Sequence, residues 1–171
     1  RVLFRSQPAL NSGDRTNTIE IAKQVIDAFE EYDFVVAPSG SCADTIKNKY
    51  PDLFAKDMQW VKRAHAMAGK TWELTSFLRE KLNVTALASS YKGVCTYHDS
   101  CSILRELGVR DQPRDLLSKV RGLTVVEMDA PEVCCGFGGT FSVKYPEISE
   151  AVKADRIARR DAVIADSDPR A

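Results

Sequence analysis

Cysteines are the side chains of this sequence whose type and spacing point most clearly to chemistry. The chain has five of them, Cys42, Cys95, Cys101, Cys134 and Cys135. The side chains of the adjacent pair Cys134-Cys135 diverge along an extended backbone, so such a pair rarely binds one small ion such as zinc. A cluster of several irons can use both sulfurs, and soft thiolates suit iron–sulfur chemistry or zinc rather than magnesium or calcium. The pair therefore predicts an iron–sulfur cluster, with a buried structural pair beside a turn as the alternative.

The residues around the pair favour the cluster. Gly136, Gly138 and Gly139 allow the backbone to approach a cofactor closely and to donate N–H groups to sulfurs. His98 lies shortly before Cys101 in the sequence. As a neutral imidazole it can hydrogen-bond a cluster sulfur and tune its potential, or it can simply order the end of a strand. Both interpretations of His98 stay open at this point.

Two further interpretations concern the same region. A catalytic pair of Cys101 and His98 would need a third group to orient the base, and Asp99 is the candidate. Adjacent residues of a strand point in opposite directions, which disfavours this arrangement. Cys95 occupies no motif position, so we expect it to be a cysteine of the hydrophobic core.

Apolar runs and helical periodicity predict the elements that position these cysteines. Strands are expected at residues 34–37, 93–98, 123–128 and 162–165. Helices are expected at residues 17–32, 41–49, 58–68, 72–82, 102–107, 113–120 and 146–160. This alternation predicts an α/β protein with parallel sheets, in which ligands bind beyond the carboxyl ends of strands. Because Cys42 and Cys101 directly follow strands and Cys134 comes a few residues after one, we expect their loops to assemble one site.

Composition narrows the class of protein. The 171 residues include 24 basic and 24 acidic side chains, and 44% of residues are hydrophobic, as in a soluble globular protein. A net charge of zero argues against a nucleic-acid partner. The basic residues Lys153, Arg156, Arg159 and Arg160 recur at helical spacing, so we expect them to form a solvated helix face.

The expected location is the cytoplasm. The sequence has no apolar run long enough to span a membrane, and its opening residues are too short for the apolar region of a signal peptide. Cytoplasmic thiols stay reduced, so clustered cysteines there indicate metal binding or catalysis rather than a disulfide framework.

Two parts of the chain resemble each other. In each, a loop of small residues is followed by a helix and then by a similar stretch, Asp33-Phe-Val-Val-Ala-Pro-Ser39 in the first and Asp161-Ala-Val-Ile-Ala-Asp-Ser167 in the second. We therefore expect a duplication, with one repeat and a helical connection over residues 1–90 and a second repeat over residues 91–171.

Longer motifs connect the sequence to a known family. Tyr97-His-Asp-Ser-Cys101, followed by Cys134-Cys-Gly-Phe-Gly-Gly-Thr-Phe-Ser-Val143, resembles the pattern of the cysteine-rich CCG domain. Gln7-Pro-Ala-Leu-Asn-Ser-Gly13 and Pro38-Ser-Gly-Ser-Cys42 resemble the first of that family's two repeats. The resemblance is strongest to iron–sulfur subunits of lactate utilization systems. Glycolate oxidase iron–sulfur subunits and the cysteine-rich subunit of heterodisulfide reductase are more distant.

The resemblance implies a role for each motif residue. Cys101, Cys134 and Cys135 would bind the second repeat's cluster, of the 4Fe–4S type in cubane or non-cubane form, and Cys42 would close the first repeat's ligand set. The chain would be a subunit of an iron–sulfur oxidoreductase that transfers electrons while lactate is oxidised to pyruvate. Its partners would be a second iron–sulfur protein and a lactate utilization C-type protein.

The sequence departs from the family pattern at both ends. The family's first Cys-Cys-Gly is replaced by Phe4-Arg5-Ser6, and the Gly and Cys expected after Pro169 are replaced by Arg170-Ala171. We therefore expect both repeats to be truncated and to lack part of their ligand sets, so that the chain alone holds an incomplete cluster site. A structural zinc module and a metal-free α/β interaction domain are the alternatives to an electron-transfer subunit.

Overall fold

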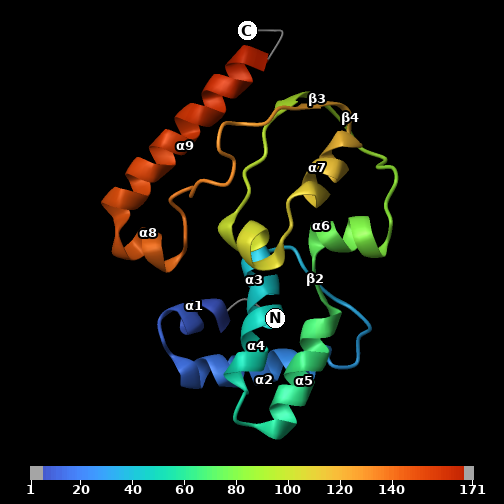
Figure 1. The fold of residues 1–171 in the computed structure, drawn as a ribbon, viewed down its shortest axis with the longest axis vertical. Helices are drawn as coiled ribbons and strands as arrows, with labels where there is room; N and C mark the ends of the chain where they lie inside the picture. The colour runs from blue at the N-terminus through green and yellow to red at the C-terminus, as the bar shows by residue number, and fades with distance from the viewer. Residues whose placement is uncertain (1–5, 168–171) are drawn as a thin grey trace. The chain divides into compact units, whose positions relative to one another are not determined.

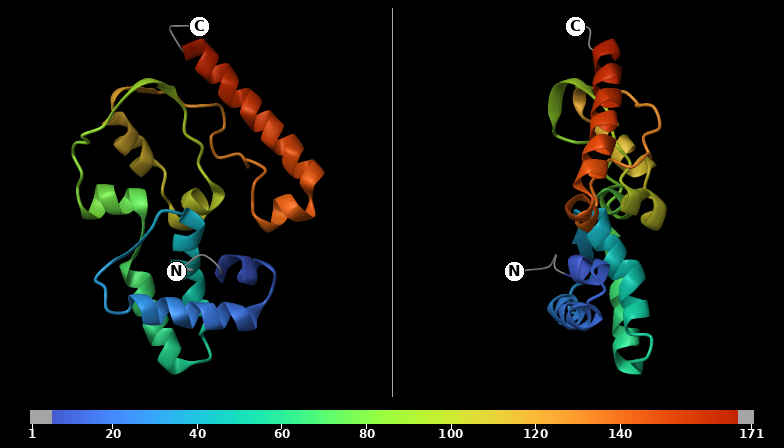
Figure 2. Two further views of the ribbon diagram at one scale, coloured as in Figure 1. Left: turned by 180° about the vertical axis from the view of Figure 1, so that it is seen from behind. Right: turned by 90° about the vertical axis from the view of Figure 1, so that its left-hand side faces the viewer.

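The chain divides into two structural units in a computed structural model that describes residues 6–167. The first unit extends to Phe77 and the second begins at Leu78 (Figures 1 and 2). Each unit contains its own two-stranded parallel sheet flanked by helices. The expected α/β class with two related parallel-sheet halves is therefore confirmed.

The first unit is mainly helical around one short sheet. Its elements are α1 (Ser6–Asn11), α2 (Arg15–Phe29), β1 (Val35–Ala37), α3 (Gly40–Asp44), the π-helical turn η1 (Thr45–Lys49), α4 (Tyr50–Leu53), α5 (Met58–Lys70), β2 (Thr71–Glu73) and α6 (Leu74–Ser76). Strand β1 pairs with β2 in parallel, so that Val35 lies opposite Thr71 and Ala37 opposite Glu73. The π-helical turn η2 (Phe77–Lys81) continues the chain into the second unit.

Side-chain caps fix where the main helices of this unit begin. The Asp14 carboxylate accepts a hydrogen bond from the backbone N–H of Asn17 at 3.1 Å and starts α2. Asp57 accepts bonds from the N–H groups of Gln59 and Trp60 and starts α5. Such caps satisfy N–H groups that have no partner within the helix. The expected helices at residues 17–32 and 58–68 are thereby confirmed, with small shifts in their ends.

An apolar core holds the first unit together. Helices α2 and α5 and the chain around α4 supply most of its buried members, which are Ala22, Val25, Ile26, Val35, Ile46, Tyr50, Leu53, Phe54, Ala64 and Met67. Apolar residues at helical spacing on α2 and α5 face this core, which explains why periodicity located both helices correctly.

Two expectations for this unit were wrong in detail. The expected helix at residues 72–82 begins later, because residues 71–73 form the strand β2 instead. A strand of three residues is too short to display the period-2 alternation that identifies strands. The expected helix at residues 41–49 continues to Leu53, since Pro51 lies in the first turn of α4, where a missing N–H costs no helical hydrogen bond.

The second unit contains the cysteine motifs. Its elements are β3 (Ser90–Cys95), the π-helical turn η3 (Ser102–Glu106), α7 (Asp111–Ser118), β4 (Arg121–Val125), α8 (Thr140–Lys144) and α9 (Pro146–Ser167). Strands β3 and β4 pair in parallel, with Cys95 opposite Val125. Gly108 follows η3 closely, and its positive φ of 66° lets the chain turn away at the end of this helical segment.

The strand expected at residues 162–165 was wrong. These residues belong to α9, the long helix at the C-terminal end of the ribbon in Figure 1. A four-residue apolar run does not separate a strand from a buried helix segment by periodicity. The departures expected at Phe4-Arg5 and after Asp168 lie outside the described residues.

Within residues 6–167, every helix is too short or too polar to cross a membrane.

Candidate functional site

Both cysteine motifs of the second unit lie on loops that leave the same edge of its sheet. Cys101 follows β3 and is exposed, and Cys134-Cys135 lies between β4 and α8. Because β3 and β4 are parallel, their carboxyl ends meet at one edge. The backbone N–H of Asp99 donates to the carbonyl of Pro131 at 3.1 Å and ties the two loops together. The placement of the two motifs beyond strand ends is therefore as expected.

The turn at the cysteine pair is closely packed. The N–H of Gly136 donates to the Cys134 sulfur at 3.4 Å, and the thiol of Cys135 donates to the carbonyl of Phe137 at 3.7 Å. Gly136 has a φ of 78°, and a Cβ there would lie 2.4 Å from the carbonyl oxygen of Ser149. The Ser149 hydroxyl donates to the Gly136 carbonyl at 2.6 Å. Only glycine fits this turn, which is pressed against the first turns of α9.

A buried ion pair supports the Cys101 loop. Asp99 is 1% exposed, and both of its carboxylate oxygens accept hydrogen bonds from Arg114 on α7, each at 2.8 Å. Arg114 also donates to Glu127 at 2.6 Å, and these two carboxylates raise the pKa of its guanidinium. Sequence reasoning considered Asp99 only as an orienting group for a histidine. Its oxygens are instead occupied by Arg114, which no local pattern identifies.

His98 contacts a buried arginine of α9. Its Nδ1 lies 3.1 Å from Nη2 of Arg156, and Arg156 also donates to the carbonyl of Asp129 at 3.4 Å. Burial, and then the charge of Arg156, lower the pKa of His98 below its ordinary value of 6.5. A guanidinium only donates, so Nδ1 accepts and the ring proton is placed on Nε2. Within residues 6–167, this buried Nε2 forms no hydrogen bond of standard geometry, and neither does Nε of Arg156.

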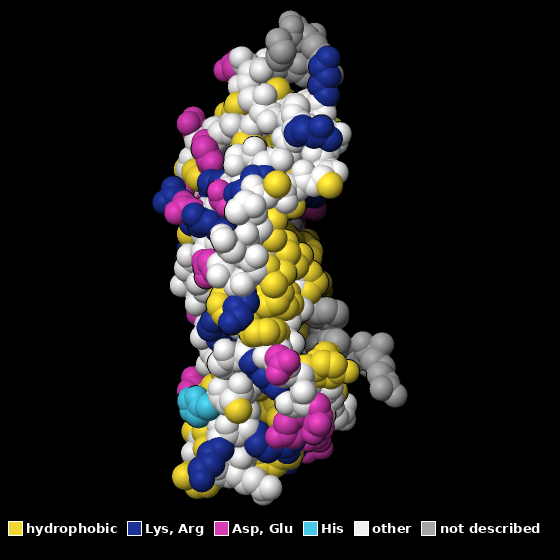
Figure 3. Space-filling model, turned by 90° about the vertical axis from the view of Figure 1, so that its right-hand side faces the viewer, with side chains coloured by type: hydrophobic (Ala, Val, Ile, Leu, Met, Phe, Trp, Pro, Cys, Tyr) yellow, Lys and Arg dark blue, Asp and Glu magenta, His cyan; other side chains and the backbone are white. Residues whose placement is uncertain are grey.

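The expectation for the basic residues of α9 was wrong in one member. Lys153, Arg159 and Arg160 are exposed, but Arg156 is only 6% exposed. On the face shown in Figure 3, basic and acidic side chains are interspersed rather than separated.

The remaining cysteine of the second unit lies on its sheet. Cys95 is the last residue of β3 and is half-buried rather than fully buried. Burial raises the pKa of its thiol, which disfavours the thiolate that metal binding requires. Its environment therefore differs from that of the exposed thiols of Cys101 and Cys134.

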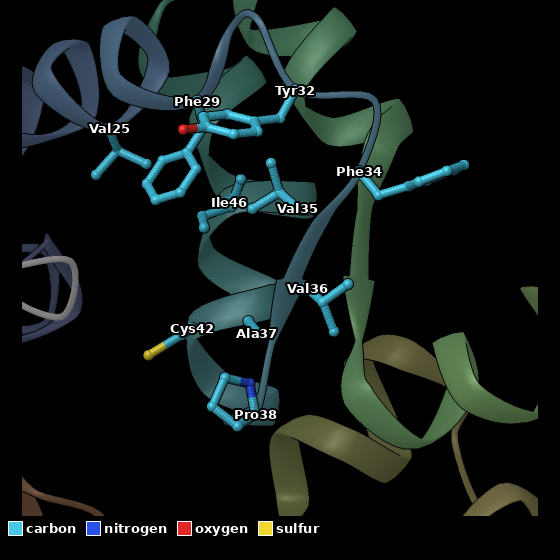
Figure 4. A pocket seen from close by; sticks show the side chains of 10 residues that line it. All are labelled: Val25, Phe29, Tyr32, Phe34, Val35, Val36, Ala37, Pro38, Cys42 and Ile46. Atoms are coloured by element: carbon cyan, nitrogen blue, oxygen red, sulfur yellow. The ribbon is translucent and has the colours of Figure 1, made fainter. Parts of the chain in front are cut away.

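Cys42 lies in the first unit beside an apolar cavity. It is on α3 directly after β1, as expected, and its side chain projects at one end of the cavity next to Ala37 and Pro38 (Figure 4). The cavity has a volume of about 170 Å³ and is lined mainly by hydrophobic side chains, including Val35 and Ile46. Sequence reasoning did not find this cavity, because it is formed by α2, β1 and η1 together.

The donor set suits an iron–sulfur group, although the ligands are not gathered. All five cysteines are free thiols. A backbone N–H already points to the Cys134 sulfur, and buried N–H donors lacking partners lie on Arg156 and His98. Among residues 6–167, however, no three His, Cys, Asp or Glu side chains stand close enough together to hold a metal ion. The ligand assignments for Cys42, Cys101, Cys134 and Cys135, and the contacts of Gly136 and His98 with the cofactor, stay predictions.

Two known proteins illustrate which sequences are similar to this chain. Lactate utilization protein A of Bacillus cytotoxicus is 47% identical over 151 residues, covering 88% of this chain and 63% of the relative. The protein of that name from Oceanobacillus iheyensis is 49% identical over 148 residues, covering 86% of the chain and 60% of the relative. The chain thus spans less than two thirds of the length of these relatives. No solved structure gave a significant match.

The family comparison gives the same result as the motifs. The sequence model of the cysteine-rich domain named CCG matches residues 6–47 and 95–167. These two regions contain Cys42 and the three cysteines of the second motif respectively, which confirms the expected duplication. The chain therefore belongs to the CCG cysteine-rich domain family.

Proposed function

We propose that this chain is part of an electron-transfer subunit in which Cys101, Cys134 and Cys135 are thiolate ligands of an iron–sulfur cluster. The observation that supports this most is the arrangement of the two cysteine loops, which leave one sheet edge and are joined by the bond from Asp99 to Pro131. Free thiols and the family membership add support.

The cluster, of the 4Fe–4S type in cubane or non-cubane form, would supply one-electron chemistry. The thiolates would hold the irons, and the N–H of Gly136 donates to the Cys134 sulfur. Hydrogen bonds to sulfur and buried donors near the site set its potential. In the first repeat, proposed to cover residues 1–90 with its helical connection, Cys42 would serve a separate ligand set. The second repeat would cover residues 91–171.

The proposed physiological process is the oxidation of lactate to pyruvate. It rests on the relatives named lactate utilization protein A, which match most of this chain. The partners would be a second iron–sulfur protein and a lactate utilization C-type protein that receive or deliver electrons. The proposed location is the cytoplasm, where five free thiols stay reduced.

Anaerobic reconstitution with iron, sulfide and an added small thiol, which can take the place of a ligand that the chain lacks, tests the cluster. We expect broad visible absorption and an EPR signal after reduction. Both should be lost or strongly decreased in Cys101→Ser and Cys134→Ser. Cys95→Ser is the matched control, because Cys95 is a free cysteine of the same unit outside the motifs, and it should keep the spectra of the unchanged chain.

Metal analysis decides between the alternatives. A colourless chain with one zinc bound by the same cysteines would replace the electron-transfer role by a structural one. A folded chain that takes up no metal would support the alternative of a metal-free interaction domain. Iron uptake that survives Cys134→Ser but is lost in Cys95→Ser would overturn the ligand assignment.

A further inference from the structure

Arg156 is a buried cation without a carboxylate partner. It is 6% exposed, and within residues 6–167 it forms no ion pair. Its two contacts are with neutral acceptors, Nδ1 of His98 at 3.1 Å and the carbonyl of Asp129 at 3.4 Å. Its Nε is buried without a partner among the described residues. Arg114 in the same unit shows the usual arrangement for a shielded guanidinium, with two carboxylates bound to it.

Burying an unpaired charge is costly, since the charge loses its hydration without gaining an opposite charge. Such a cation is stabilised when an anion occupies the space beside it. The protein therefore gains from Arg156 only if a negative group is present near it in the functional state.

The contacts of Arg156 indicate where that negative group lies. His98 is at the end of the segment that continues to Cys101, and Asp129 begins the loop that leads to Cys134. One turn before Arg156 on α9, the backbone nitrogen of Lys153 lies 3.0 Å from the position of a Cβ on Gly136. Arg156 thus joins the two cysteine-bearing segments and belongs to the helix against which the Cys-Cys-Gly turn packs.

His98 extends this arrangement. Because its Nδ1 accepts from Arg156, its remaining ring proton is on Nε2, which is buried near the Pro131 carbonyl but forms no hydrogen bond of standard geometry within residues 6–167. The low pKa of the ring keeps it neutral, so it contributes a donor and not a second charge. A buried N–H donor beside thiolates is suited to a sulfur acceptor.

We propose that Arg156, oriented by His98 and the Asp129 carbonyl, is the fixed positive charge that balances the thiolate-bound cluster and raises its reduction potential. This inference rests on the proposed function. The reduced cluster has one more negative charge than the oxidised cluster, so a nearby cation stabilises the reduced form more. Arg156 is a positioning and electrostatic residue in this scheme and not a cluster ligand.

The test compares Arg156→Met and Arg156→Gln, which remove the charge, with Arg156→Lys, which keeps it. Arg159→Met is the matched control, because Arg159 is exposed on the same helix and pairs with Asp155. Redox titration of the reconstituted chain, followed by EPR, should give a more negative potential for the Met and Gln variants. The Lys variant should lie close to the unchanged chain, and Arg159→Met should not differ from it.

A second measurement separates this role from a structural one. In the chain without iron, thermal unfolding of Arg156→Met should occur at the same or a higher temperature, because an unpaired buried charge has been removed. Loss of the cluster from both uncharged variants, with the metal-free fold intact and the Lys variant loaded, would also support the proposal.

Two results would contradict the inference about Arg156, and a third would contradict the proposed function on which it rests. If Arg156→Met or Arg156→Gln holds the cluster at an unchanged potential, the inference is wrong while the proposed function stands. If both uncharged variants unfold without iron, Arg156 is a structural residue and the inference is wrong again. If the unchanged chain assembles no cluster at all, the proposed function itself fails.

Discussion

The two units of this protein bury very different numbers of apolar side chains. Among residues 6–167, twelve of the fifteen buried hydrophobic residues belong to the first unit, and only Val109, Leu116 and Met128 belong to the second. Each unit also buries two charged residues, Asp44 and Glu73 in the first and Asp99 and Arg156 in the second. The first unit thus has an ordinary apolar core, whereas the second buries few apolar residues and has buried polar contacts beside its cysteine loops.

This difference indicates that the stability of the second unit, and not that of the first, is coupled to the cysteine site. Apolar burial stabilises the first unit without any ligand. In the second, the ion pair of Asp99 and Arg114 and the contact of His98 with Arg156 lie directly beside the segments that bear Cys101 and Cys134. We therefore expect the fold of the second unit and the geometry of the cysteine site to respond together, and three changes test this.

The largest effect is expected for Arg114→Ala. It leaves the Asp99 carboxylate buried without a partner, which costs about 3–5 kcal/mol for a buried pair. Amide hydrogen exchange should show the loss of protection in residues 78–167. Arg105→Ala is the control, since Arg105 is exposed on η3 and its removal should change stability by less than about 0.5 kcal/mol. Unchanged protection around β3 and β4 in Arg114→Ala would show that this ion pair does not hold the second unit.

Ile26→Ala tests how much the apolar core stabilises the first unit. Ile26 is 1% exposed in the core of the first unit, and its truncation is expected to cost about 2–5 kcal/mol through lost burial and a residual cavity. The reference is Gln24→Ala on the outer face of α2. Denaturant unfolding gives the free energies, and hydrogen exchange should place the effect in residues 6–77. An effect no larger than that of Gln24→Ala would contradict the assignment of this core.

The smallest expected effect is the dependence of the second unit's stability on pH. Burial and the charge of Arg156 lower the pKa of His98 in the folded state, and the Pro131 carbonyl and the Asp99 charge oppose them only in part. Below the ordinary value of 6.5, the unfolded chain therefore binds the proton more readily. Stability contributed by neutral His98 is present above pH 6.5 and is lost as the pH falls through the lower folded value. Hydrogen exchange in residues 78–167 between pH 7 and pH 5.5, roughly the range over which histidines titrate, measures it.

His98→Gln provides the control for that measurement. Glutamine keeps an acceptor for Arg156 but does not titrate, so the pH dependence should become smaller. A decline of equal size in the variant would assign the effect to another group.

Much of this arrangement was predictable because the relevant patterns are local. The helices α2 and α5 follow from apolar spacing, and the strand before Cys42 follows from a short apolar run stopped by Pro38. The loop positions of Cys101 and Cys134 follow from the strands before them. The strand β2 and the continuation of α9 through residues 162–165 were missed, because three or four residues contain too little periodicity to choose between helix and strand.

The sequence by itself determined the chemistry that this protein offers, since the identity and spacing of the cysteines and glycines do not depend on how the chain folds. It also determined the family, because those motifs are contiguous stretches of residues. Only the tertiary structure decided which charges are buried. Lys153, Arg156 and Arg159 look alike in the sequence, yet α9 turns only Arg156 inward, toward His98 and the Asp129 carbonyl. Burial depends on what the rest of the chain packs against a helix face, and helical spacing alone does not contain that information.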